Sequence, residues 1–410
     1  MSIVIDKANR PVDTSGEVWV LYEALKRYEL DWTRVSALPE FVVHAAKRYA
    51  VHMIRRGAPV SVAAFFNGTI CPLLRCASAQ RPADRLTERT FHELRELVAH
   101  DKAALQRFRK FYLSSAESRL PGFDRESAYV MYAGPIGAHR APDPALGRSA
   151  PLKKHDLDFI EEQLAAQWDS LSLDGRVALA LSLQLCPNAS PMALTRGSDL
   201  AERIDGPILH VPRHKKRLNH ERAQLKPRPI GERLAEDIHE LMDTNARLAA
   251  EMIWPDGTIG LPPGVALPIF MRREPKPSHA ALDCPVREFA LHRAGTEVSA
   301  LIQRTVAVLC EAAGRPIIRM TARVGKRTVL TEAQRQGLPP EVVADIGDHT
   351  SIRHIPRYAA EGLEVIEHVQ NAIGDRLAQL CGSYTPVAGR LSSDKAELLL
   401  GFRESTFGSR

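Results

Sequence analysis

The stretch IGDHTSIRHIPRYAA, residues 346–360, gathers side chains that could hold a phosphate. It places His349, Arg353 and Arg357 ahead of one tyrosine, Tyr358. Arginine and protonated histidine donate charge-assisted hydrogen bonds, so a group of them around one hydroxyl suits a phosphate. Whether these residues form a site depends on the cations that other segments bring to them.

Basic residues also cluster elsewhere in the chain. The stretch ILHVPRHKKR, residues 208–217, ends in a basic run, and RVGKR, residues 323–327, carries three more cations. The formal net charge is only +6. Local clusters of basic residues are better evidence for nucleic acid than the total charge is. Basic faces on the helices expected in the first domain fit either a solvated surface or contact with DNA phosphates.

The composition and the missing motifs narrow the chemistry. Hydrophobic residues make up 44% and charged residues 25% of the chain, as in ordinary globular proteins. The sequence has no Gly-rich phosphate loop, H-E-x-x-H or G-x-S-x-G motif, and its six cysteines show no C-x-x-C spacing. We therefore expect no metal and no cofactor. With no secretory signal and no apolar run of about 18 residues, a cytoplasmic, nucleoid-associated protein without membrane contact is expected.

The length of 410 residues predicts two folded domains. Residues 1–18 show no periodicity and are interpreted as an N-terminal arm. Residues 19–123 carry apolar residues at three- and four-residue intervals, as in LYEALKRYEL, and predict a helical domain. Residues 124–152 are rich in Pro and Gly and predict an extended linker.

The second domain is expected over residues 153–382. It is predicted to be mostly helical, with a small antiparallel hairpin at 207–230 kept short by two prolines. The segment LPIFM is a candidate for a further short strand, and residues 363–380 predict a closing amphipathic helix. Residues 383–410 are interpreted as a tail. The fold class is thus mainly α with a small antiparallel β-sheet.

The order of these segments resembles the tyrosine recombinase (phage integrase) family. ALALSLQLCPNASPMALTRGSDL resembles the helix–turn–helix stretch that carries the first family arginine, and ILHVPRHKKR with LKPRPIG resembles the hairpin that carries a catalytic lysine. The stretch from Ala312 to Tyr358 resembles the family segment with the H-x-x-R, Gly-His and tyrosine motifs. The resemblance covers the second domain and, more loosely, the first, which it likens to the core-binding domain.

This resemblance implies a two-domain clamp that closes on double-stranded DNA, with strand cleavage and rejoining through a 3′-phosphotyrosyl intermediate. Tyr358 matches the nucleophile and His349 the Gly-His histidine, although Asp348 intervenes after Gly347. Lys216, or Lys215 beside it, matches the hairpin lysine. The resemblance further implies a homo- or hetero-tetramer on DNA, with a partner recombinase as one option. The residues expected to contact DNA are Arg213, Lys215, Arg217, Arg327, Arg353 and Arg357.

Three positions depart from the family pattern and leave the activity open. Asn188 stands at the first family arginine, Arg323 at the histidine of H-x-x-R, and Lys326 at its arginine. Asparagine carries no charge, and lysine lacks the planar fork of arginine. Arg196, Arg319 or Arg327 could refill the pocket. The readings that remain are an active divergent recombinase, a catalytically impaired accessory protein of a mobile element that still binds DNA, and an unrelated helical regulator, which predicts no hairpin at 207–230.

Overall fold

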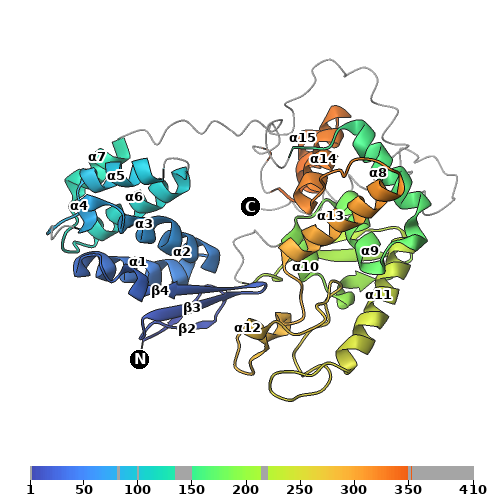
Figure 1. The fold of residues 1–410 in the computed structure, drawn as a ribbon, viewed down its shortest axis with the longest axis horizontal. Coiled ribbons are helices and arrows are strands. Elements are labelled where there is room, and N and C mark those ends of the chain that lie inside the picture. Colours follow the sequence, from blue (N-terminus) through green and yellow to red (C-terminus); the bar gives the residue numbers. More distant parts are fainter. Residues whose placement is uncertain are drawn as a thin grey trace, which may run out of the picture.

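The computed structural model describes residues 2–80, 84–98, 101–133, 150–213, 220–349 and 352. These residues form two lobes, one of residues 2–133 and one of residues 150–349 (Figure 1). Helices dominate both lobes, and the strands form three small antiparallel sheets. The prediction of a mainly α protein with a small antiparallel sheet is therefore confirmed.

The first lobe opens with four strands, where we had expected an arm and a helix. β1 (Ile3–Ile5) pairs with β2 (Pro11–Asp13), and β3 (Val18–Glu23) pairs with β4 (Lys26–Asp31). The prediction of a helix in LYEALKRYEL is wrong, because this segment forms parts of β3 and β4. The sequence VWVLYE alternates buried Trp19 and Leu21 with less buried residues, and such β-branched and aromatic residues suit a half-buried strand.

In the described part of the first lobe, seven α-helices follow and enclose an aromatic core. Trp32, Phe65, Phe66, Phe108 and Phe111 are among its fully buried side chains. A π-helical turn joins the second and third helices. The helices are α1 (Glu40–Arg56), α2 (Pro59–Phe65), α3 (Cys71–Leu73), α4 (Ala77–Gln80), α5 (Glu88–Leu97), α6 (Lys102–Glu117) and α7 (Arg125–Ala133).

Helix α7 lies inside the segment that we had expected to be linker. Its Ala128 and Met131 are buried in the core of the first lobe, so the linker prediction is wrong for this part. The apolar residues of RESAYVMYA form a helix that packs into this core, although the sequence that follows them is rich in Pro and Gly. The rest of the expected linker up to residue 149 lies outside the described residues, as do the predicted helix at 363–380 and the tail at 383–410.

The second lobe contains the hairpin that the sequence predicted. β6 (Ile208–Pro212) pairs with β7 (Leu225–Pro229), and β5 (Leu200–Ala201) completes the sheet on the other side of β6. The hairpin at 207–230 is confirmed, which contradicts the unrelated-regulator reading. The two prolines of β7 lie on an edge strand, where a missing N–H costs little. LPIFM forms isolated bridges at Pro268 and Met271 rather than the expected strand.

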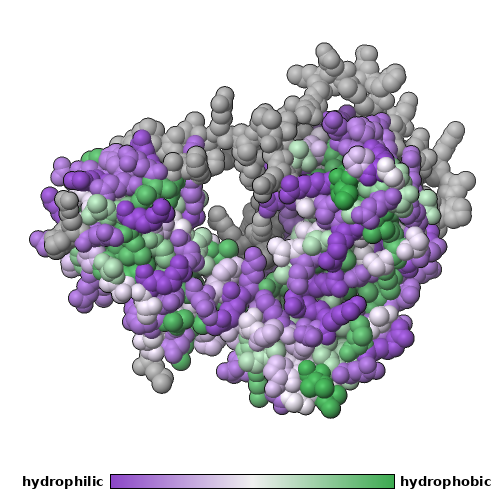
Figure 2. Space-filling view, in the orientation of Figure 1, coloured by the Kyte–Doolittle hydropathy of each residue, from purple (hydrophilic) through white to green (hydrophobic). Residues whose placement is uncertain are grey.

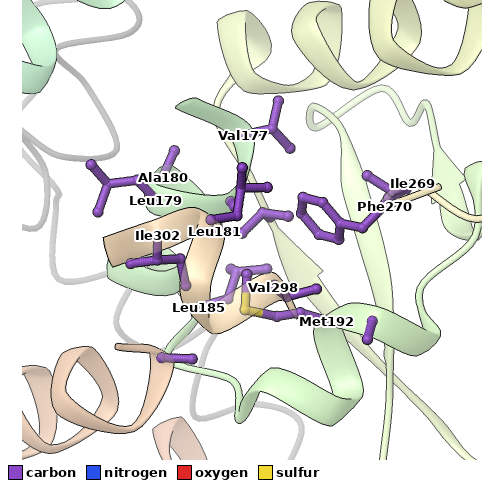
Figure 3. Close-up of a cluster of buried hydrophobic side chains, with 14 of the residues drawn as sticks. Val177, Leu179, Ala180, Leu181, Leu185, Met192, Ile269, Phe270, Val298 and Ile302 are labelled. Atoms are coloured by element: carbon purple, nitrogen blue, oxygen red, sulfur yellow. The ribbon is translucent and has the colours of Figure 1, made fainter. Parts of the chain in front are cut away.

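The described residues of the second lobe also form eight α-helices, of which α10 contacts β6. Nine of the thirteen residues of α9 are buried, and α9 packs against α13, α11 and α14. Figure 3 shows side chains of α9, of α13 and of the segment with Phe270 gathered in one cluster. The helices are α8 (Lys154–Ala166), α9 (Leu173–Leu185), α10 (Ala189–Leu194), α11 (Glu232–Ala250), α12 (Pro277–Ala280), α13 (Gly295–Ala312), α14 (Ala322–Arg335) and α15 (Pro340–Ile346).

The β3–β4 hairpin extends from the first lobe to the second (Figure 1). Ala24 and Leu25, at its turn, are buried in the core of the second lobe. On the face shown in Figure 2, polar residues cover most of both lobes. Within the described residues, no helix is long and apolar enough to cross a membrane.

Candidate functional site

The C-terminal end of α15 places His349 through a defined capping motif. The His349 N–H donates to the Ala344 carbonyl at 2.8 Å, and the Asp348 N–H donates to the Asp345 carbonyl at 3.0 Å. Asp348 itself is left-handed, with φ of 49°. This is the Schellman pattern, in which the left-handed residue is usually glycine. The aspartate between Gly347 and His349 is therefore the residue that turns the chain, and aspartate tolerates this conformation better than most residues.

Gly347 leaves room for the imidazole of His349. A Cβ on Gly347 would lie 2.6 Å from Cδ2 of His349 and 2.9 Å from Cδ1 of Leu330. Any larger residue would push the ring away or open the contact between α15 and α14. The Gly-Asp-His sequence thus fixes both the path of the chain and the position of the ring.

Four cations converge on this helix end, and we call Arg213, Lys226, Arg228 and Lys326 the α15 clasp. Lys326 Nζ donates to the Gly347 carbonyl at 2.5 Å. Lys226 Nζ donates to the Asp345 carbonyl at 2.9 Å, and Arg228 Nη2 donates to the carbonyls of Asp345 and Ile346 at 2.8 and 2.9 Å. The last carbonyls of a helix lack internal partners and form the negative end of its dipole, so they attract cations.

The clasp also includes ion pairs with two aspartates of α15 and its cap. Arg213 Nε donates to Asp348 Oδ1 at 2.7 Å, and Lys226 Nζ contacts the Asp345 carboxylate. Burial lowers the pKa of Lys226, against the opposing effect of Asp345. Lys326 is 8% exposed. The cations are thus held on the protein's own acceptors.

Cys186 connects the end of α9 to the clasp. Burial raises the pKa of its thiol to about 12, although the charges of Lys326 and Arg228 act in the opposite direction. Both cations therefore lie within electrostatic reach of Cys186, which adopts a left-handed conformation where α9 ends. Asn188 follows two residues later as the N-cap of α10, and its side chain makes no capping hydrogen bond. Asn188, which the sequence analysis matched to the first family arginine, thus lies two residues after a cysteine that is within electrostatic reach of the clasp.

The structure brings some of the predicted site residues together. Lys326, His349 and Arg213 meet at the end of α15, but Arg213 pairs with Asp348. Arg323 lies one turn before Lys326 and is exposed, and its side chain forms no hydrogen bond or ion pair within the described part of the chain. Arg327 is half-buried on α14. The predicted residues that lie outside the described ones are Tyr358, Lys215, Lys216, Arg217, Arg353 and Arg357.

Lys226 and Arg228 are clasp residues that the sequence analysis missed. They alternate with prolines in LKPRP, so both point to the same face of β7. This alternation of basic residues was the signal that could have revealed them. Arg196, one candidate to refill the pocket, instead donates to Glu288 at 2.6 Å and stacks on Phe289.

No group of three or more His, Cys, Asp or Glu side chains among the described residues is placed to hold a metal ion. A lysine or arginine of the clasp can bind an anion, such as a phosphate, once it is released from its own carbonyl or carboxylate acceptor. Arginine and lysine both bind phosphates, the former bidentately.

Comparison with known proteins gives matches in structure only. No family model matches the chain, and no curated protein matches it. The chain is similar to a lambda integrase dimer bound to a core site, with 11% identity, a TM-score of 0.48 and coverage of 77% of this chain and 94% of that one. It is similar to the Tn1549 transposon integrase in complex with transposon right-end DNA, with 12% identity, a TM-score of 0.47 and coverage of 78% and 95%.

A third similar structure is the XerH site-specific recombinase bound to a palindromic difH substrate, with 10% identity, a TM-score of 0.46 and coverage of 82% of this chain and 84% of that one. Similarity at this level concerns the arrangement of the chain. The chemistry of this protein has to be inferred from its own residues.

Proposed function

We propose that this chain binds double-stranded DNA and acts as a divergent tyrosine recombinase. The observation that carries the proposal is the α15 clasp, where Lys326, His349 and the β6–β7 hairpin meet. Arg213 and Asp348 are 135 positions apart in the sequence, yet their side chains form an ion pair. Arg213, Lys326 and His349, which come from three separate basic motifs, are thus near one another among the described residues, and this supports the proposal.

In this proposal Tyr358 attacks the scissile phosphorus and the bond to the 5′ oxygen breaks. Lys216, or Lys215, gives a proton to the leaving 5′ oxygen, and His349 donates a hydrogen bond to the phosphate or carries a proton. Lys326 and Arg323 supply positive charge to the nonbridging oxygens. A 5′-hydroxyl of another strand then attacks the phosphotyrosine and releases the tyrosine. Because the ester keeps the bond energy, the reaction needs no cofactor.

A second function, a DNA-binding accessory protein without strand cleavage, is favoured by the state of Lys326. This side chain is 8% exposed and donates to the Gly347 carbonyl, so its charge stabilises a helix end. Asn188 adds no charge at the other degenerate position. Loss of one charge-stabilising donor typically lowers the rate about 100- to 1000-fold. Either function includes assembly on DNA, as a tetramer or with a partner recombinase.

A covalent trapping experiment separates the two functions. The protein is incubated with nicked duplexes, in which cleavage releases a short strand that diffuses away, so that the strand cannot be rejoined. Protein–DNA adducts are then separated on a denaturing gel. We expect an adduct with the natural chain and none with Tyr358→Phe. Tyr129→Phe is the matched control, because Tyr129 is an exposed tyrosine on α7 of the first lobe.

DNA binding has to be measured in the same samples. If the natural chain binds duplexes but forms no adduct with any of a set of element-end and random sequences, the accessory function is supported. If Tyr358→Phe still forms the adduct, Tyr358 is not the nucleophile. Absence of duplex binding at 50 mM salt would contradict both functions, since phosphate contacts are strongest at low salt.

A further inference from the structure

Arg10, at the start of the first lobe, forms a buried ion pair with Glu221 of the second lobe. Its Nη1 and Nη2 donate to Oε1 and Oε2 of Glu221 at 2.9 and 2.6 Å. The two side chains are 8% and 10% exposed. Burial alone would raise the pKa of Glu221, but hydrogen bonds and charge from Arg10 outweigh it and lower the pKa. Glu221 is therefore ionised at neutral pH, and a buried charge of this kind depends on its partner.

The turn between β3 and β4 is seated at the same place. The Ala24 N–H donates to Glu221 Oε1 at 2.9 Å, and Lys276 Nζ donates to the Leu25 carbonyl at 2.7 Å. Tyr22 packs edge-on against His279, with ring centroids 6.0 Å apart. The turn therefore makes hydrogen bonds with two residues of the second lobe, Glu221 and Lys276, and its own apolar residues pack into the core of that lobe. This combination is typical of a specific interface.

The residues next to Glu221 are fixed to the second lobe. His220 contacts Glu288, and Arg222 makes a bidentate pair with Asp199 at 2.6 and 2.9 Å. Strand β7 begins four residues after Glu221 and carries Lys226 and Arg228 of the α15 clasp. The ion pair with Arg10 thus holds the chain immediately before the strand that supplies half of the clasp.

We propose that Arg10 is a positioning residue, which acts through Glu221 to fix both the arrangement of the two lobes and the start of β7. The docked turn prepares the two lobes for a duplex before DNA arrives, which lowers the ordering that binding would otherwise require. This role rests on the proposed DNA-binding function. Both terminal nitrogens of Arg10 donate to the Glu221 carboxylate, and Nη1 also donates to the Tyr22 carbonyl, so in this role Arg10 makes no direct contact with DNA.

Two measurements on the free full chain test the docking without DNA. Solution X-ray scattering reports the arrangement of the lobes, and hydrogen exchange reports the stability of β7. We expect Arg10→Ala and Glu221→Ala to increase the radius of gyration and to speed exchange at the amides of Lys226 and Arg228.

The matched control is Arg176→Ala. Arg176 and Asp237 form a pair of the same length, 2.6 Å, with side chains 11% and 8% exposed, and both lie in the second lobe. This variant should destabilise the second lobe without changing the radius of gyration. Unchanged scattering and unchanged β7 exchange in a folded Arg10→Ala protein would overturn the proposal.

A third measurement links the docking to DNA. Duplex affinity should fall about tenfold in Arg10→Ala, while the slope of log affinity against log salt stays the same, because no phosphate contact is lost. Arg10→Lys keeps the charge without the fork and should lie between the natural chain and Arg10→Ala. A slope reduced by about one would instead identify Arg10 as a phosphate contact and contradict the positioning role. If the natural chain binds no duplex, the proposed function fails, and the docking is judged by scattering and exchange alone.

Discussion

The Arg213 guanidinium and the Asp348 carboxylate form an ion pair between the end of β6 and the residue that turns the chain into His349. The Nε to Oδ1 distance is 2.7 Å, and both side chains are partly exposed. A cation that we expected on DNA is thus paired with a carboxylate of the protein. Since carboxylate and phosphate oxygens accept the same hydrogen bonds from arginine, Asp348 and a DNA phosphate would compete for Arg213.

Replacement of Asp348 by asparagine should therefore strengthen binding to duplex DNA. Asparagine tolerates the left-handed conformation, so the chain reversal is kept while the charge is removed. We expect a several-fold gain in affinity at low salt and a salt slope steeper by about one. Binding titrations between 50 and 200 mM salt measure both. Asp205→Asn changes the net charge equally at an exposed turn of the second lobe; an equal gain there would contradict local competition.

Removal of the clasp donors from β7 should loosen the end of α15. Lys226→Met and Arg228→Met keep much of the side-chain volume but leave carbonyls of Asp345 and Ile346 without these donors. We expect each variant to lower the free energy of unfolding by about 1 kcal/mol and to speed amide exchange at Asp348 and His349. Urea unfolding and hydrogen exchange measure the two effects.

The control for the clasp variants is Arg233→Met. Arg233 pairs with Asp169 at 2.8 Å on an exposed surface, so its loss should change stability by less than about 0.5 kcal/mol. If amide exchange at Asp348 and His349 is as slow in the clasp variants as in this control, Lys226 and Arg228 do not stabilise the end of α15.

Gly325 sets the close approach of α14 to α9. A Cβ there would lie 2.7 Å from Ser182 Oγ and 3.1 Å from Met320 Cε. Gly325→Ala should therefore destabilise the protein by about 1–3 kcal/mol, as measured by urea unfolding. Ser182 Oγ is buried and has no hydrogen-bond partner within the described residues, so Ser182→Ala alone should have little effect. The double variant should recover most of the lost stability; strictly additive losses would contradict the steric explanation.

Two buried histidines should make the second lobe less stable in acid. Burial lowers the pKa of His292 to about 3 and that of His279 to about 4, with the charge of Lys276 assisting at His279. The unfolded chain binds these protons near pH 6.5, so stability is constant above that pH and falls as the pH drops below it. At pH 5.5 each histidine should cost on the order of 1 kcal/mol. Urea unfolding at pH 7.5, 6.5 and 5.5 measures the loss.

A substitution of His292 tests whether this histidine causes the pH dependence of stability. His292→Gln should flatten the decline between pH 6.5 and 5.5, although it lowers stability at every pH. His155→Gln, at an exposed histidine of α8, is the control and should leave the decline unchanged. A decline of equal steepness in both variants would assign the effect to other groups.

The sequence predicted those helices and strands whose residue pattern lies within a single segment. The β6–β7 hairpin and most helices follow from periodicity and turn residues that lie within each segment. The β3–β4 hairpin was missed because LYEALKRYEL also fits helical spacing; burial of Trp19, Leu21 and Leu30 in a core made by other helices decides for strands.

The candidate site was predictable only in part for the same reason. The Gly-Asp-His sequence and RVGKR pointed to Lys326 and His349. The partners of Arg213 and Arg10 lie 135 and 211 positions away, and no local pattern records such pairs. The role of Asp348 as the left-handed turn residue also emerged only from the backbone, where its φ is 49°.

The seating of the β3–β4 turn also has a consequence for how the chain is made. The turn leaves the ribosome early, whereas Glu221 and Lys276, which receive it, are synthesised much later. The first lobe can form its own aromatic core before then. Ala24 and Leu25, however, stay exposed to water until the second lobe has formed the core that buries them. We therefore expect the lobes to dock only after the second lobe has folded, because contacts between distant parts of a chain generally form slowly.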